Sequence, residues 1–174
     1  IFCSTKETHH VELPTTPRID RSHPVIGRQY LISIYDTVLR TRHSEKGIDV
    51  DLVADAKERN VCWRWFIEER NLKIIIKPFC HQMTYLYANS DGLVGLTWRR
   101  HLFLSTENED GSWSFLSDSG YFLSAASNKS VYAVKEQTSA TRFRLQPWEE
   151  IACCDCPDEF DVVDGKCGGF YTAI

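Results

Sequence analysis

The chain has 174 residues, with 24 Asp and Glu against 20 Lys and Arg, and a formal net charge of -4. This length suits one domain with a single buried core. The acidic balance argues against a nucleic-acid partner, because such binders need a concentrated basic face. No apolar run approaches the roughly 18 residues of a membrane-spanning helix, so no membrane insertion is expected. Aromatic residues make up 12% of the chain, which favours strands.

Residues 1–25 carry proline, histidine and scattered charges without a period, and we expect an extended N-terminal arm. The chain begins at Ile1 rather than Met, which fits a mature product after removal of a targeting peptide, although a truncated chain would begin in the same way. His9 and His10 with Cys3 have metal-ligand chemistry, but a solvated pair is the simpler interpretation and no metal site is expected.

Strand patterns follow at residues 28–34 and 37–43. The acidic stretch 44–60 then interrupts the rhythm and is expected to be an insertion in a loop. Within it, either a strand at residues 48–53 or a short helix toward Arg59 is compatible with the pattern.

Two further strands, at residues 62–69 and 72–79, are expected to be joined by a tight turn near Arg70 and Asn71. Beyond them the sequence contains two similar copies of one strand–turn–strand pattern. Thr84-Tyr-Leu-Tyr-Ala-Asn-Ser-Asp-Gly-Leu-Val is followed by Gly120-Tyr-Phe-Leu-Ser-Ala-Ala-Ser-Asn-Lys-Ser-Val, and Gln29-Tyr-Leu-Ile-Ser is a fainter copy. Three copies of a strand unit in one small domain suggest threefold pseudosymmetry.

This sequence repeat predicts the remaining strands. Asp-Gly pairs between segments of alternating apolar residues indicate hairpin turns. These strands are expected at residues 84–89, 93–98, 101–108, 113–118, 121–126, 130–135, 141–148 and 149–154. Together with the earlier ones they make twelve, in three groups of four. Alternation also predicts a core, which consists of Trp63, Trp65, Phe66, Phe103, Phe115, Phe143 and Leu145.

The passages Tyr85-Leu-Tyr-Ala, Gly111-Ser-Trp-Ser-Phe-Leu-Ser, Gly120-Tyr-Phe-Leu-Ser-Ala and Thr141-Arg-Phe-Arg-Leu resemble the β-trefoil superfamily, most closely its fascin-like and cytokine-like members. The resemblance covers about residues 26–152. It implies an all-β fold, a single β-trefoil of twelve short strands in three pseudo-repeats. It also implies that the first and last strands lie beside each other. The cysteine content of residues 153–174 indicates a cystine-rich C-terminal tail after it.

Four of the seven cysteines crowd this tail, at positions Cys153, Cys154, Cys156 and Cys167. A segment with so little apolar material usually needs disulfides, which persist in oxidising compartments, so we expect a secreted, extracellular protein. A zinc site is the competing interpretation, since Cys153 and Cys156 have the spacing of a metal knuckle. No second pair or downstream histidine completes such a site.

The β-trefoil resemblance implies that the arm and the tail leave from one end of the fold, and hence a bridge from Cys3 to one of Cys153, Cys154 or Cys156. Cys62 and Cys80 flank the open ends of a two-strand unit and are expected to form a second bridge. Cys167 then closes a loop onto the cluster. The odd cysteine stays unpaired or links two chains into a dimer.

Catalysis has no support in the motifs. The chain lacks a Gly-rich phosphate loop, a Gly-x-Ser-x-Gly elbow and a His-Glu-x-x-His helix. The carboxylate pairs Glu68-Glu69, Asp49-Asp51 and Glu149-Glu150 lie in charged, surface-like contexts and are explained as solvated groups. We therefore expect no enzyme and no cofactor.

The most suggestive surface cluster is Trp98, Arg99, Arg100 and His101. An aromatic face beside two guanidiniums can stack on a sugar, or grip sulfate and carboxylate groups bidentately. The alternative is that Trp98 plugs the end of the fold while both arginines are solvated or pair with Glu107 or Glu109.

A second basic stretch consists of Arg40, Arg42, His43 and Lys46, and is open to the same alternative. Asn128-Lys-Ser130 is an N-glycosylation sequon on an expected loop, which is meaningful if the chain is secreted. We expect Asn128 to carry a glycan.

The leading functional interpretation is a secreted, non-enzymatic β-trefoil that binds a cell-surface or matrix macromolecule as a receptor ligand. Residues 44–60 and the tail are its distinguishing surfaces. A carbohydrate-binding lectin is the alternative, with the cluster at residues 98–101 as its platform. A trefoil protease inhibitor is a further alternative, whereas fascin-like actin bundling would need a reducing cytosol.

Overall fold

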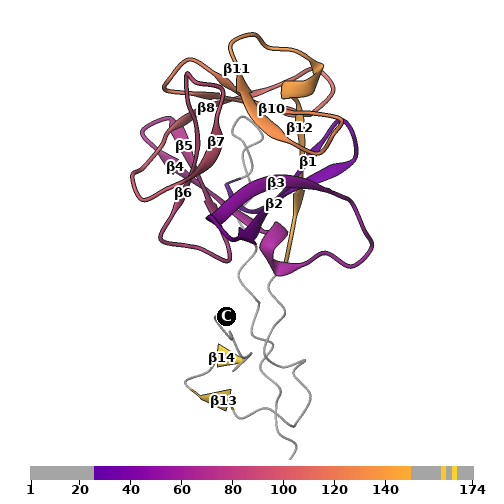
Figure 1. Ribbon diagram of the computed structural model, residues 1–174, viewed down its shortest axis with the longest axis vertical. Coiled ribbons are helices and arrows are strands. Elements are labelled where there is room, and N and C mark those ends of the chain that lie inside the picture. The colour runs from indigo at the N-terminus through magenta and orange to yellow at the C-terminus, as the bar shows by residue number, and fades with distance from the viewer. Residues whose placement is uncertain (1–25, 150–161, 164–165, 168–174) are drawn as a thin grey trace, which may run out of the picture.

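The computed structural model describes residues 26–149, 162–163 and 166–167 of the chain. Their regular secondary structure consists of β-strands and two 3₁₀ turns, η1 (Val61–Trp63) and η2 (Ser139–Thr141) (Figure 1). The strands are β1 (Gly27–Ser33), β2 (Thr37–Ser44), β3 (Gly47–Ala54), β4 (Trp65–Arg70), β5 (Lys73–Pro78), β6 (Tyr85–Ala88), β7 (Val94–Thr97), β8 (Phe103–Glu107), β9 (Trp113–Ser117), β10 (Phe122–Ala125), β11 (Val131–Val134), β12 (Phe143–Pro147), β13 (Val162–Val163) and β14 (Lys166–Cys167). No helix among the described residues is long and apolar enough to cross a membrane.

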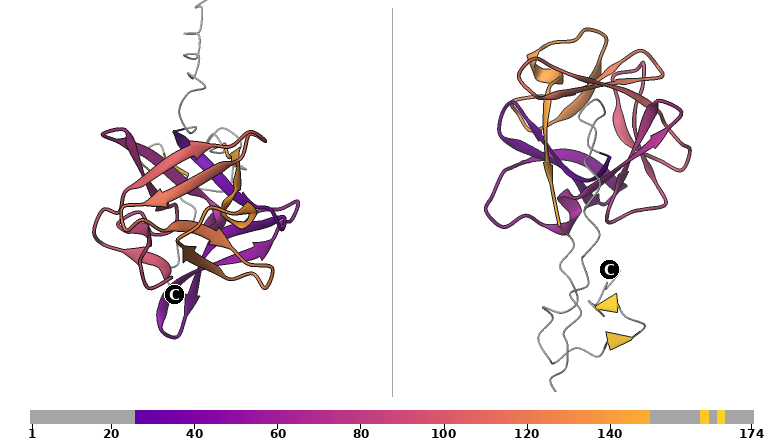
Figure 2. Two further views of the ribbon diagram at one scale, coloured as in Figure 1. Left: turned by 90° about the horizontal axis from the view of Figure 1, so that it is seen from above. Right: turned by 180° about the vertical axis from the view of Figure 1, so that it is seen from behind.

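Six strands pair in a closed antiparallel ring. β1 pairs with β4 and β12, β5 pairs with β4 and β8, and β9 pairs with β8 and β12. Three hairpins, β2–β3, β6–β7 and β10–β11, accompany the ring, and these strands wind around a common centre (Figure 2). β13 and β14 form a separate antiparallel pair. Closing a sheet on itself removes its exposed edges. The prediction of an all-β fold is confirmed, and the architecture is consistent with a β-trefoil.

The first and last strands of this ring lie side by side, as the β-trefoil resemblance implied. β1 and β12 are in register from Gln29 opposite Pro147 to Ser33 opposite Phe143. One residue further, the Trp148 amide donates to the Arg28 carbonyl at 3.2 Å. The chain therefore enters and leaves the domain at neighbouring points. The predicted bridge from Cys3 to Cys153, Cys154 or Cys156 lies outside the described residues.

The ring strands supply most of the core. Trp65, Phe103, Phe115 and Phe143 have no exposed surface, as their alternation predicted. A second cluster packs outside the ring and contains Tyr30, Ile32, Val38, Trp63 and Trp148. The predicted core residues Phe66 and Leu145 are only partly buried. Phe66 lies on the opposite face of β4 from the fully buried Trp65 and packs against the second cluster, whereas Leu145 lies on the same face of β12 as Phe143 and packs against the first.

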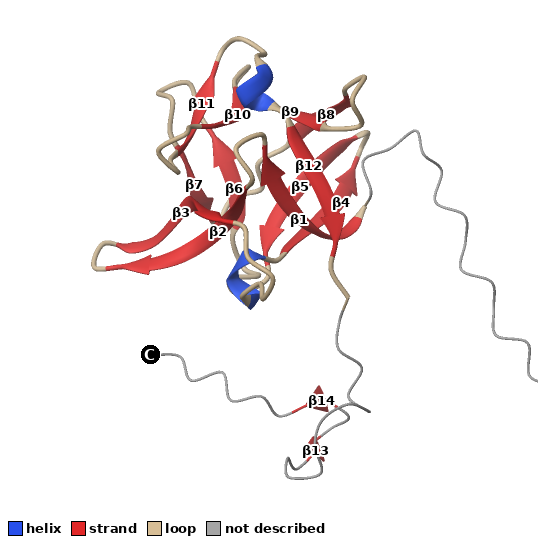
Figure 3. Cartoon of the chain, turned by 90° about the vertical axis from the view of Figure 1, so that its right-hand side faces the viewer, coloured by secondary structure: helices blue, strands red, loops and turns tan. Residues whose placement is uncertain are grey.

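The acidic stretch is not a loop insertion. β3 pairs with every residue of β2, so the predicted loop is wrong and the alternative of a strand at residues 48–53 is correct. The pairing sets Asp51 opposite Arg40 and Asp49 opposite Arg42, and the Arg40 Nε–Asp51 Oδ1 distance is 2.7 Å. The aspartates, which the sequence suggested were solvated, therefore stabilise the β2–β3 hairpin through cross-strand ion pairs. Figure 3 shows this hairpin projecting from the body of the domain.

Several strand boundaries also differ from the prediction, most clearly in the strands expected at residues 62–69 and 149–154. Residues 62 and 63 belong to η1, because the Asn60 side chain accepts the Cys62 amide at 2.9 Å and caps the turn; the strand begins at Trp65. In the predicted strand at residues 149–154, Glu149 is not in a strand and the remaining residues lie outside the described ones. The expected tight turn is present, with positive φ at Asn71 and Leu72, the geometry of a hairpin turn that suits strand twist.

Candidate functional site

Trp98 is one of the most exposed side chains of the domain, with 87% of its surface accessible. Arg99 and Arg100 are exposed beside it. The β6–β7 register ends with Tyr85 opposite Thr97, so Trp98 lies beyond the last pair and has no core position to fill. The alternative in which Trp98 plugs the fold is therefore wrong. We call Trp98, Arg99 and Arg100 the platform.

His101 points inward and is not part of the platform. Its Nε2 accepts the Ala88 amide at 3.4 Å, and its ring makes edge contacts with Tyr87 and Phe103 at centroid distances of 6.2 and 5.3 Å. Burial lowers the pKa of His101 below its ordinary value of 6.5, while the Asp118 charge opposes that shift. The histidine thus anchors the connection to the β6–β7 hairpin.

This burial predicts a pH dependence of stability. Because the pKa of His101 is lower in the folded state, the unfolded chain binds more protons below pH 6.5, and the free energy of unfolding should fall as the pH drops through that window. Denaturant unfolding curves recorded between about pH 8 and 5 measure how the free energy of unfolding changes with pH. His101→Gln should reduce this pH dependence. Part of it should remain because burial also lowers the pKa of His81. Equal slopes in the variant and the parent chain would contradict the assignment.

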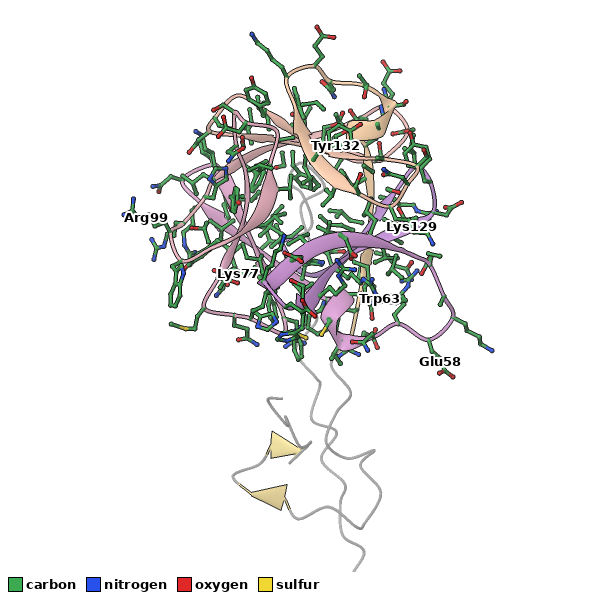
Figure 4. The ribbon with its side chains drawn as sticks, viewed as in Figure 1. Glu58, Trp63, Lys77, Arg99, Lys129 and Tyr132 are labelled. Atoms are coloured by element: carbon green, nitrogen blue, oxygen red, sulfur yellow. The ribbon has the colours of Figure 1, made fainter. Side chains whose placement is uncertain are left out.

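The two platform arginines differ from every other arginine in residues 26–149. Arg28 and Arg64 lie over the Trp148 ring, at 5.4 and 5.1 Å from its centroid. The other six pair with carboxylates: Arg40, Arg42, Arg59, Arg70, Arg142 and Arg144. Among the described residues, Arg99 and Arg100 form no ion pair, so the alternative pairing with Glu107 or Glu109 is not realised. Both arginines are exposed, and Figure 4 shows Arg99 at the surface of the domain. A guanidinium carries five N–H donors.

The two arginines of the second basic stretch are neutralised within their own hairpin. Hydrogen bonding to Asp51 raises the pKa of Arg40, and Arg42 lies within 3.6 Å of the same carboxylate. His43 makes an edge contact with His81 at 5.1 Å. This surface therefore offers less positive charge to a ligand than its sequence indicates.

Sequence reasoning missed Met83, which is 82% exposed. Met83 lies two residues before Tyr85, which pairs with Thr97 at the end of the β6–β7 register. Met83 is therefore an exposed apolar side chain at the same end of the hairpin as the platform. No periodic signal marks it, because Met83 lies in the turn before β6.

A shallow hollow of about 520 Å³ is the other candidate. It is lined by Tyr30, Asp55, Ala56, Lys57, Arg59 and Gln146. Arg59 donates two hydrogen bonds to Asp55, at 2.8 and 2.7 Å, and covers the Tyr30 ring at 4.6 Å. The bonds from Arg59 lower the pKa of Asp55. The strongest ligand-binding groups of the hollow already satisfy one another, which favours the platform as the site.

Cys62 and Cys80 lie side by side as free thiols. Burial, together with a hydrogen bond to Cys62, raises the pKa of Cys80 to about 12. Their bridge stays a prediction, as do the pairings of Cys153, Cys154 and Cys156. Cys167 is in β14, opposite Val162. No cluster of three or more potential metal ligands occurs among the described residues.

Asn128 is exposed in the β10–β11 turn, where its Oδ1 accepts the Ser130 hydroxyl at 2.6 Å and the Ser130 amide at 3.1 Å. The sequon is therefore accessible. Its glycosylation stays a prediction.

Comparison with known proteins supports the fold. No family model matches the sequence, and no curated protein matches it. A mosquitocidal holotoxin superposes with a TM-score of 0.62 and 11% identity over 73% of this chain, which spans 18% of the toxin chain. SeviL, whose structure contains the asialo-GM1 saccharide, superposes with a TM-score of 0.58 and 14% identity over 70% of this chain and 98% of its own. At such low identity these similarities establish the all-β fold and carry no function by themselves.

Proposed function

We propose that this chain is a carbohydrate-binding protein and that the platform holds the sugar. The observation that carries the proposal is the exposed Trp98 indole beside two guanidiniums that have no ion-pair partner among the described residues. An aromatic face packs on the apolar face of a sugar ring, and guanidiniums donate to its oxygens. The saccharide bound to SeviL supports a glycan as the ligand class.

A glycan is preferred over a receptor protein as the partner. The receptor-ligand interpretation drew on residues 44–60 and on the tail. Residues 47–54 are instead a hairpin strand whose aspartates pair with Arg40 and Arg42. The tail lies outside the described residues except for β13 and β14.

The remaining features of the proposal come from the sequence. We infer a secreted, disulfide-bonded glycoprotein without catalytic activity, in which an N-terminal arm (1–25) and a cystine-rich tail (153–174) flank one β-trefoil (26–152). The three hairpins attached to the six-stranded ring support three pseudo-repeats. A fascin-like or cytokine-like subtype and a dimer linked by the odd cysteine stay predictions.

The proposal predicts that Trp98→Ala weakens glycan binding at least about tenfold, because truncating a central aromatic contact typically costs about 2 kcal/mol. A glycan array identifies the ligand and isothermal titration calorimetry measures the loss. Tyr132→Ala is the matched control, since Tyr132 is an exposed aromatic residue on β11, away from the β7–β8 connection. No glycan bound by the parent chain, or equal binding by Trp98→Ala, would contradict the proposal.

A further inference from the structure

We propose, resting on the proposed carbohydrate function, that the platform selects saccharides that carry an anionic group, a carboxylate or a sulfate, next to the ring that packs on Trp98. The inference combines three properties of the site. These are the unpaired charge, the anchored backbone and the existing ion pairs of the arginines on the other candidate surfaces.

The first property is charge. The chain has a net charge of -4, and its other described arginines have carboxylate or aromatic partners, yet two adjacent guanidiniums stay without one. A guanidinium presents a planar fork of donors that matches carboxylate and sulfate oxygens. A neutral sugar would use some of these donors, but only an anion also offsets the local positive charge.

The second property is preorganisation. The connection that carries the platform is held at both ends by hydrogen bonds. At its start the Arg99 amide donates to the Thr97 hydroxyl at 3.3 Å. At its end His101 accepts the Ala88 amide, and the Leu102 carbonyl accepts the Asp118 amide at 3.1 Å. An anchored backbone lowers the entropy cost of presenting the indole and the guanidiniums together.

The third property is selectivity among surfaces. The other arginines that sequence or shape single out are already neutralised. Arg40 and Arg42 pair with β3 aspartates, and Arg59 in the hollow pairs with Asp55. An anionic sugar that met these surfaces would have to displace a carboxylate. The platform offers its donors without that cost.

The test uses the full chain and matched probes that share one disaccharide: lactose, 3′-sialyllactose and 3′-sulfolactose, with array glycans in neutral, sialylated and sulfated versions of the same core. We expect at least one anionic probe to bind about tenfold or more tightly than its neutral counterpart, and its affinity to fall with added salt. The probe that binds more tightly identifies carboxylate or sulfate as the preferred group. Arg99→Gln/Arg100→Gln should abolish the preference.

Arg144→Gln is the matched control, since Arg144 is 62% exposed but pairs with Asp36 on another surface. The control should keep the preference for the anionic probe. Equal binding of neutral and anionic probes, or an unchanged preference in the double variant, would overturn the inference while leaving a Trp98-dependent neutral lectin intact. Absence of binding to any glycan, or binding insensitive to Trp98→Ala, would overturn the proposed function and this inference together.

Discussion

Trp65→Ala is expected to lower the free energy of unfolding by about 3–5 kcal/mol, the range for truncating a buried tryptophan. Trp65 has no exposed surface and packs inside the six-stranded ring with Phe103 and Phe143. Its Nε1 donates to the Leu39 carbonyl at 2.9 Å, so the substitution also leaves a buried acceptor without its donor. Equilibrium denaturation in urea, monitored by circular dichroism, measures the loss.

Trp98→Ala is the matched control, because it makes the same substitution at an exposed position. Its effect on stability should stay within about 0.5 kcal/mol. Trp65→Phe separates packing from hydrogen bonding, since it keeps a buried ring but removes the N–H donor. Similar losses for Trp65→Ala and Trp98→Ala would contradict the assignment of Trp65 to the core and of Trp98 to the surface.

The bridge between Cys62 and Cys80 has the second largest expected effect. It would join η1 to the turn after β5 and close a loop whose size corresponds to about 3 kcal/mol of stabilisation in the chain-entropy account. Under oxidising conditions, Cys62→Ala/Cys80→Ala should therefore be less stable than the parent chain by about this amount. Non-reducing peptide mapping identifies the bridge, and denaturation measures its contribution.

Reduction supplies the control for this experiment. With a phosphine reductant present, the parent chain and the double variant should differ much less, since both then lack the bridge. In the reduced chain, Cys80 should be alkylated slowly at neutral pH, because its pKa of about 12 leaves little thiolate. Free thiols at both positions in the oxidised protein would contradict the bridge.

Local signals in the sequence were sufficient for much of the fold. The echo between residues 84–94 and 120–131 predicted the β6–β7 and β10–β11 hairpins, and alternation predicted the burial of Trp65, Phe103, Phe115 and Phe143. These features are readable because a strand places successive side chains on opposite faces. The acidic stretch was wrongly predicted to be a loop insertion. Its aspartates form ion pairs with Arg40 and Arg42 on β2, and the sequence alone does not reveal which residues pair across two strands.

The same distinction applies to the platform. The run from Trp98 to His101 could be recognised from its residue types, because an aromatic ring beside guanidiniums has a defined chemistry wherever it lies. Only the tertiary structure separates the outward Trp98 from the inward His101, and leaves Arg99 and Arg100 as the arginines without an ion pair or aromatic contact among the described residues. Residue chemistry and strand periodicity are properties of the local chain. Exposure and charge pairing depend on residues that are distant in sequence and meet only when the ring of strands closes.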